Sequence, residues 1–115
     1  MVLCTYMPYD KDLAERIRDL LSERPGVEEK KMFGGLTFLV GGNMACGVAA
    51  ETLMVRVGAA AYEDALGHPH CRECDFTGRP LKGMVTIEPR GFASAGDLRA
   101  WVERGFSFAG SLPAK

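Results

Sequence analysis

The residue types best suited to chemistry lie close together between positions 68 and 74. His68, His70, Cys71 and Cys74 are four possible zinc ligands, and the two cysteines form a CxxC pair. A structural zinc site needs four ligands in a tetrahedron, usually two from each of two separated segments. One short loop can hardly surround an ion when His70 and Cys71 are adjacent. We therefore expect a polar loop with free thiols, and no bound metal or other cofactor.

The same CxxC pair is the basis of an alternative, a small metal- or thiol-dependent protein. Redox pairs of the thioredoxin type lie at a helix N-terminus after a strand, where the thiolate is stabilised. Cys71 and Cys74 instead follow a short helical pattern and precede a turn-rich segment. None of the serines lies in a G-x-S-x-G elbow. The sequence thus predicts a protein that is not an enzyme.

A second group of functional candidates follows the cysteines. Arg79 and Lys82 flank a turn that contains Gly78 and Pro80. A guanidinium group is a planar, permanently charged fork that suits carboxylates and phosphates, and loops on a rigid sheet often carry recognition residues. We expect these four residues to contact a partner protein. The alternative is an internal salt bridge from Arg79 to a nearby carboxylate.

The overall charge argues for a protein partner over direct binding to DNA. Fourteen basic and fifteen acidic residues give a net charge of −1, whereas domains that bind DNA through phosphates usually carry a positive excess. Any contact with DNA is therefore expected to be indirect, although basic strand ends leave a direct DNA binder as a weaker alternative. No apolar run reaches the roughly 20 residues of a membrane span, and residues 1–9 lack the basic start of a secretory signal. We expect a cytoplasmic chain, as a monomer or weak homodimer.

The elements that must position these residues are those of one α+β domain spanning residues 1–115. Residues 10–24 show helical spacing of apolar residues after Asp10, a good N-cap. From residue 28 to residue 57, short alternating runs predict an antiparallel meander, with a hairpin turn at Gly41-Gly42-Asn43. A middle helix (59–66), a loop (68–81), a late strand (82–88) and a last helix capped by Ser94 follow. Residues 107–115 are expected to form a flexible tail.

Alternation within the meander predicts which side chains are buried. Arg56 is expected on the face opposite to the buried one. The buried face should carry five apolar residues: Phe38, Val40, Cys46, Val55 and Val57. The same alternation places Met44 with Cys46, and Ala45 on the other face. Trp101 lies in the apolar stripe of the last helix, so we expect it in the core.

Two motifs in this order resemble the TfoX (Sxy) N-terminal domain family. The first is Met32-Phe33-Gly34-Gly35, preceded by Lys31 and followed by an apolar strand and the glycine turn. The second runs from Asp75 to Val85 and includes Gly78, Arg79, Pro80 and Lys82. The resemblance covers nearly the whole chain. We interpret the first motif as structural, with Gly34 and Gly35 in the positive φ region that glycine tolerates.

This resemblance implies an α+β domain that regulates natural competence and transcription in bacteria. TfoX-type regulators act with the cyclic-AMP receptor protein at promoters, so that protein is the partner that the family suggests. The full-length regulators carry a second, helical domain, and we expect this chain to be a stand-alone domain of the N-terminal type. The resemblance implies a non-enzymatic, protein-binding module.

Overall fold

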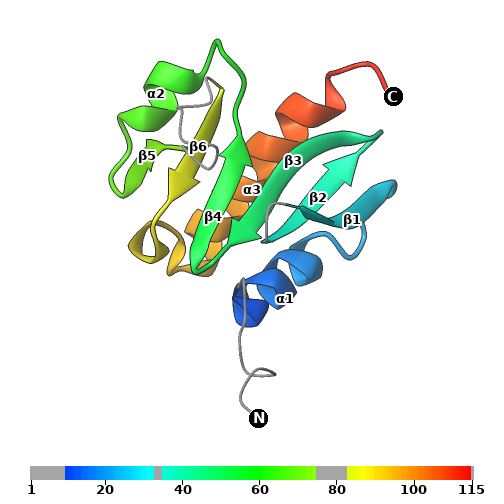
Figure 1. The fold of residues 1–115 in the computed structure, drawn as a ribbon, viewed down its shortest axis with the longest axis horizontal. Coiled ribbons are helices and arrows are strands. Elements are labelled where there is room, and N and C mark those ends of the chain that lie inside the picture. Colours follow the sequence, from blue (N-terminus) through cyan, green and yellow to red (C-terminus); the bar gives the residue numbers. More distant parts are fainter. Residues whose placement is uncertain (1–9, 33–34, 75–82, 115) are drawn as a thin grey trace.

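Six strands form one antiparallel sheet in the computed structural model, which describes residues 10–32, 35–74 and 83–114 (Figure 1). The strands are β1 Val27–Met32, β2 Gly35–Val40, β3 Asn43–Ala49, β4 Thr52–Arg56, β5 Cys71–Glu73 and β6 Met84–Ile87. Their order across the sheet is β1-β2-β3-β4-β6-β5. The predicted α+β class, an antiparallel meander followed by a late strand, is confirmed.

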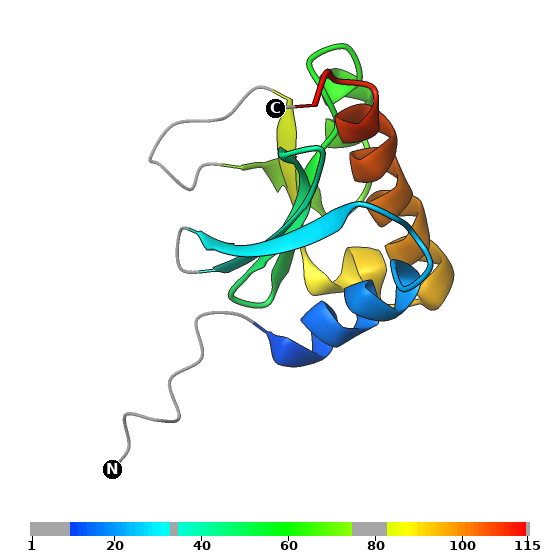
Figure 2. The ribbon, with the colours of Figure 1, turned by 90° about the vertical axis from the view of Figure 1, so that its right-hand side faces the viewer.

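The described residues form three α-helices beside the sheet, α1 Lys11–Leu20, α2 Tyr62–Leu66 and α3 Ala95–Gly110, and a short 3-10 turn, η2, at Pro89–Phe92. Figure 2 shows α1 and α3 on the same side of the sheet. Both predicted N-caps are confirmed, because Asp10 accepts from the amides of residues 12 and 13 and Ser94 accepts from Asp97. Within the described ranges, no helix is both long and apolar enough to cross a membrane.

The glycine turn joins β2 to β3 as predicted. Gly41 and Gly42 have φ angles of 60° and 81°, and Val40 pairs with Asn43 across the two-residue loop. Two successive positive φ angles match the twist of the flanking strands, which is why such hairpins favour glycine and asparagine. The turn therefore fixes which residues of β2 and β3 pair next to it.

One part of the predicted alternation is wrong, because β3 contains a bulge. Phe38 pairs with Cys46 and Leu39 with Met44, so Ala45 is an extra residue on β3. A bulge of this kind lets two successive side chains approach the same face. Ala45 and Cys46 both lie in the core, whereas Met44 is half-buried outside it.

The rest of the predicted buried face is confirmed. Phe38, Cys46 and Val55 are fully buried in one cluster, Val57 belongs to it, and Val40 packs against its edge. Arg56 lies outside the cluster and is half-buried. The cluster combines side chains of α1, α3 and the sheet, and the largest fully buried members from the helices are Leu13, Ile17, Leu98, Val102 and Phe106. Trp101 is 7% exposed in this cluster, as expected for a core residue.

Helix α3 approaches the sheet most closely at Gly105. A methyl group at this position would overlap the carbonyl oxygen of Ala45 and lie 3.0 Å from its carbonyl carbon. It would also lie 3.4 Å from a methyl group of Val55. Only glycine permits this spacing, because backbone atoms of β3 cannot move aside as a flexible side chain can. Gly105 therefore sets the distance between α3 and the sheet.

The first family-like motif lies at the β1–β2 turn. Met32 ends β1 and Gly35 begins β2, while Phe33 and Gly34 fall outside the described residues. Gly35 is not among the residues with positive φ, so the expected reason for this glycine is wrong. A side chain at Gly35 would instead overlap the carbonyl oxygen of Val48 on β3. Its role is a close approach between neighbouring strands.

Two further segments differ from the sequence-based prediction. Cys71–Glu73, expected in a loop, forms the edge strand β5 beside β6, with Cys71 opposite Ile87. Helix α3 continues past Ser107 to Gly110, so the start of the expected tail is helical. Beyond the helix, the backbone carbonyl of Pro113 accepts a 3.0 Å hydrogen bond from Asn43. The described part of the tail thus lies against the central hairpin.

The Gly105→Ala substitution should lower the free energy of unfolding by about 1–3 kcal/mol, because overpacking against rigid backbone outweighs the roughly 1 kcal/mol gain in helix propensity. Gly96→Ala in the same helix is the matched control, since nothing lies within 4 Å of the added methyl group. The control should keep or slightly raise stability. Urea unfolding of both variants measures the difference. Equal stability of the two variants would contradict this account of the helix–sheet distance.

Candidate functional site

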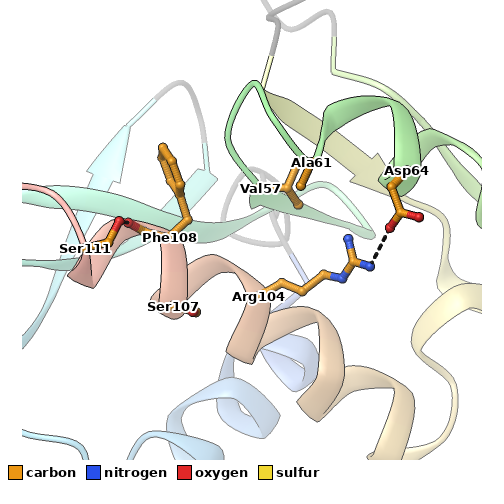
Figure 3. Close-up of a pocket in the computed structure, with 7 residues that line it drawn as sticks. All are labelled: Val57, Ala61, Asp64, Arg104, Ser107, Phe108 and Ser111. Atoms are coloured by element: carbon orange, nitrogen blue, oxygen red, sulfur yellow. Dashed lines mark hydrogen bonds and ion pairs between the residues drawn. The ribbon is translucent and has the colours of Figure 1, made fainter.

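A groove between α2 and the C-terminal half of α3 is the candidate site, and we call it the α2/α3 groove. It has a volume of about 420 Å³. Figure 3 shows the side chains that line it: Val57, Ala61, Asp64, Arg104, Ser107, Phe108 and Ser111. Val57 directly follows β4, Ala61 is the N-cap of α2, Asp64 lies within α2, and the other four lie on or just after α3.

The position of α2 beside α3 depends on the chain that leaves β4. The backbone amides of Val57 and Gly58 donate to the carbonyl oxygen of Gly83, at 2.8 and 3.0 Å. These bonds fix the segment before α2 against the start of β6. Tyr62 and Ala65 then bury one side of α2 in the main core, which leaves Asp64 exposed toward α3.

A polar network closes one end of the α2/α3 groove. Arg104 donates to a carboxylate oxygen of Asp64 at 3.0 Å, as Figure 3 shows, and the same Nη2 atom lies 3.3 Å from Nε2 of His68. The guanidinium carbon lies 5.2 Å from the centroid of the Trp101 ring. His68 meets the same indole edge to face, with 5.3 Å between ring centroids. Arg104 is thus oriented by a carboxylate, an imidazole and an indole.

An arginine also contacts Phe108, at the other end of the α2/α3 groove. The Arg56 guanidinium carbon lies 5.4 Å from the centroid of the Phe108 ring. Contacts of this kind stabilise a partly exposed arginine by roughly 0.5–1 kcal/mol. Ser111 is committed to the helix end, because its hydroxyl donates to the Phe108 carbonyl. Ser107 is exposed, so its side chain can be enlarged without disturbing the core.

The shape and lining of the groove suit an apolar side chain. Its floor is apolar, from Val57, Ala61 and Phe108, and its rim carries one acidic and one basic side chain that already pair with each other. Asp64 and Arg104 expose 71% and 32% of their side chains, so this pair adds little to stability. The groove can accept an apolar side chain of a partner while the rim contacts charges of both signs.

The four residues considered as zinc ligands have other surroundings. His68 contacts Trp101 and Arg104, while His70 has a φ of 65° at the turn into β5 and its carbonyl accepts from Glu88. Cys71 is half-buried and Cys74 is buried. Within the described ranges, no three side chains of the kinds that bind metals gather into a group.

The thiols of Cys46 and Cys71 have a higher pKa than free cysteine. Burial raises the pKa of Cys46 to about 12. Burial also raises the pKa of Cys71 to about 11, although the positive charge of Arg104 opposes the shift. Reactive cysteines need the opposite change, a lowered pKa that populates the thiolate. The environment of Cys71 therefore does not favour the thiol-dependent alternative.

The partner-binding residues predicted from the sequence, Gly78, Arg79, Pro80 and Lys82, lie outside the described residues. They remain a prediction, and Gly83 is the nearest described neighbour. The α2/α3 groove was not predicted. Helical spacing places Trp101 beside Arg104 on one helix, but it does not show that α2 and α3 meet.

The comparisons with known proteins give one match. The model of the TfoX N-terminal domain family matches residues 19–109, which is most of the chain. The matched range includes all of β1 to β6, α2 and nearly all of α3. No curated protein and no solved structure matches the chain.

The raised pKa of Cys46 predicts how stability changes with pH. The unfolded chain loses this proton near pH 9 and the folded chain near pH 12, so above about pH 9 the folded state binds more protons. Its stabilising contribution is complete below pH 9 and is lost as the pH rises toward 12, by up to about 1.4 kcal/mol per pH unit.

Urea unfolding at about pH 8 and about pH 10 tests this, with Cys46→Ala as the comparison. The native protein should lose more stability between these pH values than the variant does. Tyr62, whose pKa burial also raises, contributes equally to both proteins. An identical pH dependence in the two would show that Cys46 is not buried as a neutral thiol.

Proposed function

Because the chain belongs to the TfoX N-terminal domain family, we propose that it is a regulatory module that acts by binding another protein and not by catalysis. The observation that carries this proposal is the α2/α3 groove, with its apolar floor and its charged rim. Grooves of this kind accept an apolar anchor residue, and such anchors supply most of the energy of a protein interface.

The charges of the rim favour a protein over a small anion. A small anion needs an unpaired cation, whereas Arg104 is already held by Asp64 and stacked near Trp101. A protein surface can contact Asp64 and Arg104 together through side chains of opposite sign. Such complementary charges select the partner and speed association more than they tighten binding.

The same proposal includes the four residues that the sequence predicted as partner-binding: Gly78, Arg79, Pro80 and Lys82. Lys82 is joined to Gly83, whose carbonyl oxygen accepts from Val57 and Gly58 at the floor of the groove. The covalent link of this segment to Gly83 is the reason to consider Arg79 and Lys82 together with the groove. We propose that both parts contact one partner.

The family suggests a partner among transcription regulators, with the cyclic-AMP receptor protein as the candidate. On this proposal the module works in the cytoplasm and reaches DNA only through its partner. The net charge of −1 supports an indirect contact, because direct binding to phosphates releases counterions and usually requires a positive excess.

The Ser107→Trp substitution should block the α2/α3 groove and weaken partner binding by about tenfold or more, equivalent to about 1.4 kcal/mol. Ala100→Trp, also exposed on α3 but outside the groove, is the matched control and should bind normally. Calorimetric titration with the cyclic-AMP receptor protein, or with a partner captured from a bacterial lysate, measures both affinities. Circular dichroism checks that both variants remain folded.

The Arg79→Ala, Lys82→Ala double variant is the second arm of the same titration. A folded double variant with weakened binding supports a surface shared with the groove. Native affinity in a folded Ser107→Trp variant would exclude the groove as the binding site. Native affinity in the folded double variant would exclude the 78–82 segment.

A further inference from the structure

Strand β1 forms one edge of the sheet, and Figure 2 shows it crossing the side of the protein turned toward the viewer. Among the described strands it pairs only with β2, along its whole length. Its four central side chains are exposed: Glu28, Glu29, Lys30 and Lys31. An edge strand of this kind presents backbone donors and acceptors to which another strand can bond.

The order of charges along β1 distinguishes it from an ordinary protected edge. Charged side chains on an edge usually prevent indiscriminate pairing. Here two acidic residues are followed by two basic residues, and such a series is complementary to itself when a second copy runs in the opposite direction. The charges of β1 can therefore disfavour pairing with unrelated edge strands and still permit pairing with β1 of a second copy.

Symmetry decides which residues can face each other. A two-fold axis perpendicular to the sheet keeps each side chain on its own face, so partners must come from the same face. Glu28 and Lys30 share a face, because strand alternation separates them from Glu29. Glu29 lies opposite Phe38, on the face that packs under α3.

We propose that a second copy of this chain adds its β1 antiparallel to this strand, centred on Glu29, to form one continuous sheet. Glu28 then faces Lys30 of the second copy, and the two-fold axis repeats the pair. Directly opposed side chains of opposite charge stabilise antiparallel strands. The same pairing lets the backbone N–H and C=O groups on the outer edge of β1 form hydrogen bonds with β1 of the second copy.

At the centre of this dimer Glu29 of one copy faces Glu29 of the other. Each carboxylate is paired with an arginine of its own chain. Glu29 accepts two hydrogen bonds from Arg18, both of 2.8 Å. The two arginines offset the repulsion between the two carboxylates. A register centred on Lys30 would instead place two lysines face to face, and no described residue forms an ion pair with Lys30.

The size of the contact sets the strength of the dimer. A five-residue strand pairing buries less than the roughly 1,000 Å² of a stable interface, so association should be weak and should depend on protein concentration. Both charge pairs are exposed, so added salt should weaken the dimer further. The α2/α3 groove plays no part in this contact, and the two proposals can fail independently.

Sedimentation velocity under reducing conditions, from about 10 μM to about 1 mM protein, tests the proposal. The native chain should shift toward dimer as the concentration rises. Glu28→Lys and Lys30→Glu, tested separately, should each weaken dimerisation by about tenfold, because each places like charges opposite one another. An equimolar mixture of these two variants should dimerise again, since opposite charges then face each other.

Glu51→Lys, an equal charge change at an exposed turn, is the control and should dimerise as the native chain does. The doubly exchanged variant, Glu28→Lys with Lys30→Glu, should also dimerise. A native chain that stays monomeric at about 1 mM would overturn the proposal. Single variants that dimerise normally, or a mixture that does not recover, would also overturn it.

Discussion

The contact between Gly105 of α3 and the Ala45 carbonyl of β3 is the constraint on which the rest of this structure depends. No side chain separates helix from sheet at this point, so the helix lies close enough for its stripe of apolar residues to close the core. The bulge of β3 belongs to the same contact, because it brings Ala45 into the face that α3 covers. The glycine at position 105 of α3 is thus matched to the position of the bulge in β3.

The same helix carries the candidate site. Trp101, Val102 and Phe106 face the core, while Arg104, Ser107 and Phe108 line the α2/α3 groove. The position of α3 on the sheet therefore also determines the width of the α2/α3 groove. The charged contacts around Arg104 orient its side chain, but their exposure means that packing, and not ion pairing, keeps the helix in place.

The sequence predicted those elements that depend on residues close to one another in the chain. The glycine turn and strand alternation gave the central hairpin and most of the buried face, and Asp10 and Ser94 marked two helix starts. Met44 and Ala45 were assigned to the wrong faces because a bulge interrupts the alternation, and Gly105, which packs against Ala45, lies sixty residues further along the chain. Strand β5 was missed because three residues carry no measurable period. The groove could not be predicted, since it requires two helices to meet.

The most direct test of the account is an NMR titration of the ¹⁵N-labelled chain with its captured partner. If the α2/α3 groove is the binding surface, the amide signals of Ala61, Ser107 and Ser111 should shift or broaden together as partner is added. Unchanged signals at these three residues, with changes confined to β1 or to α1, would contradict the central claim.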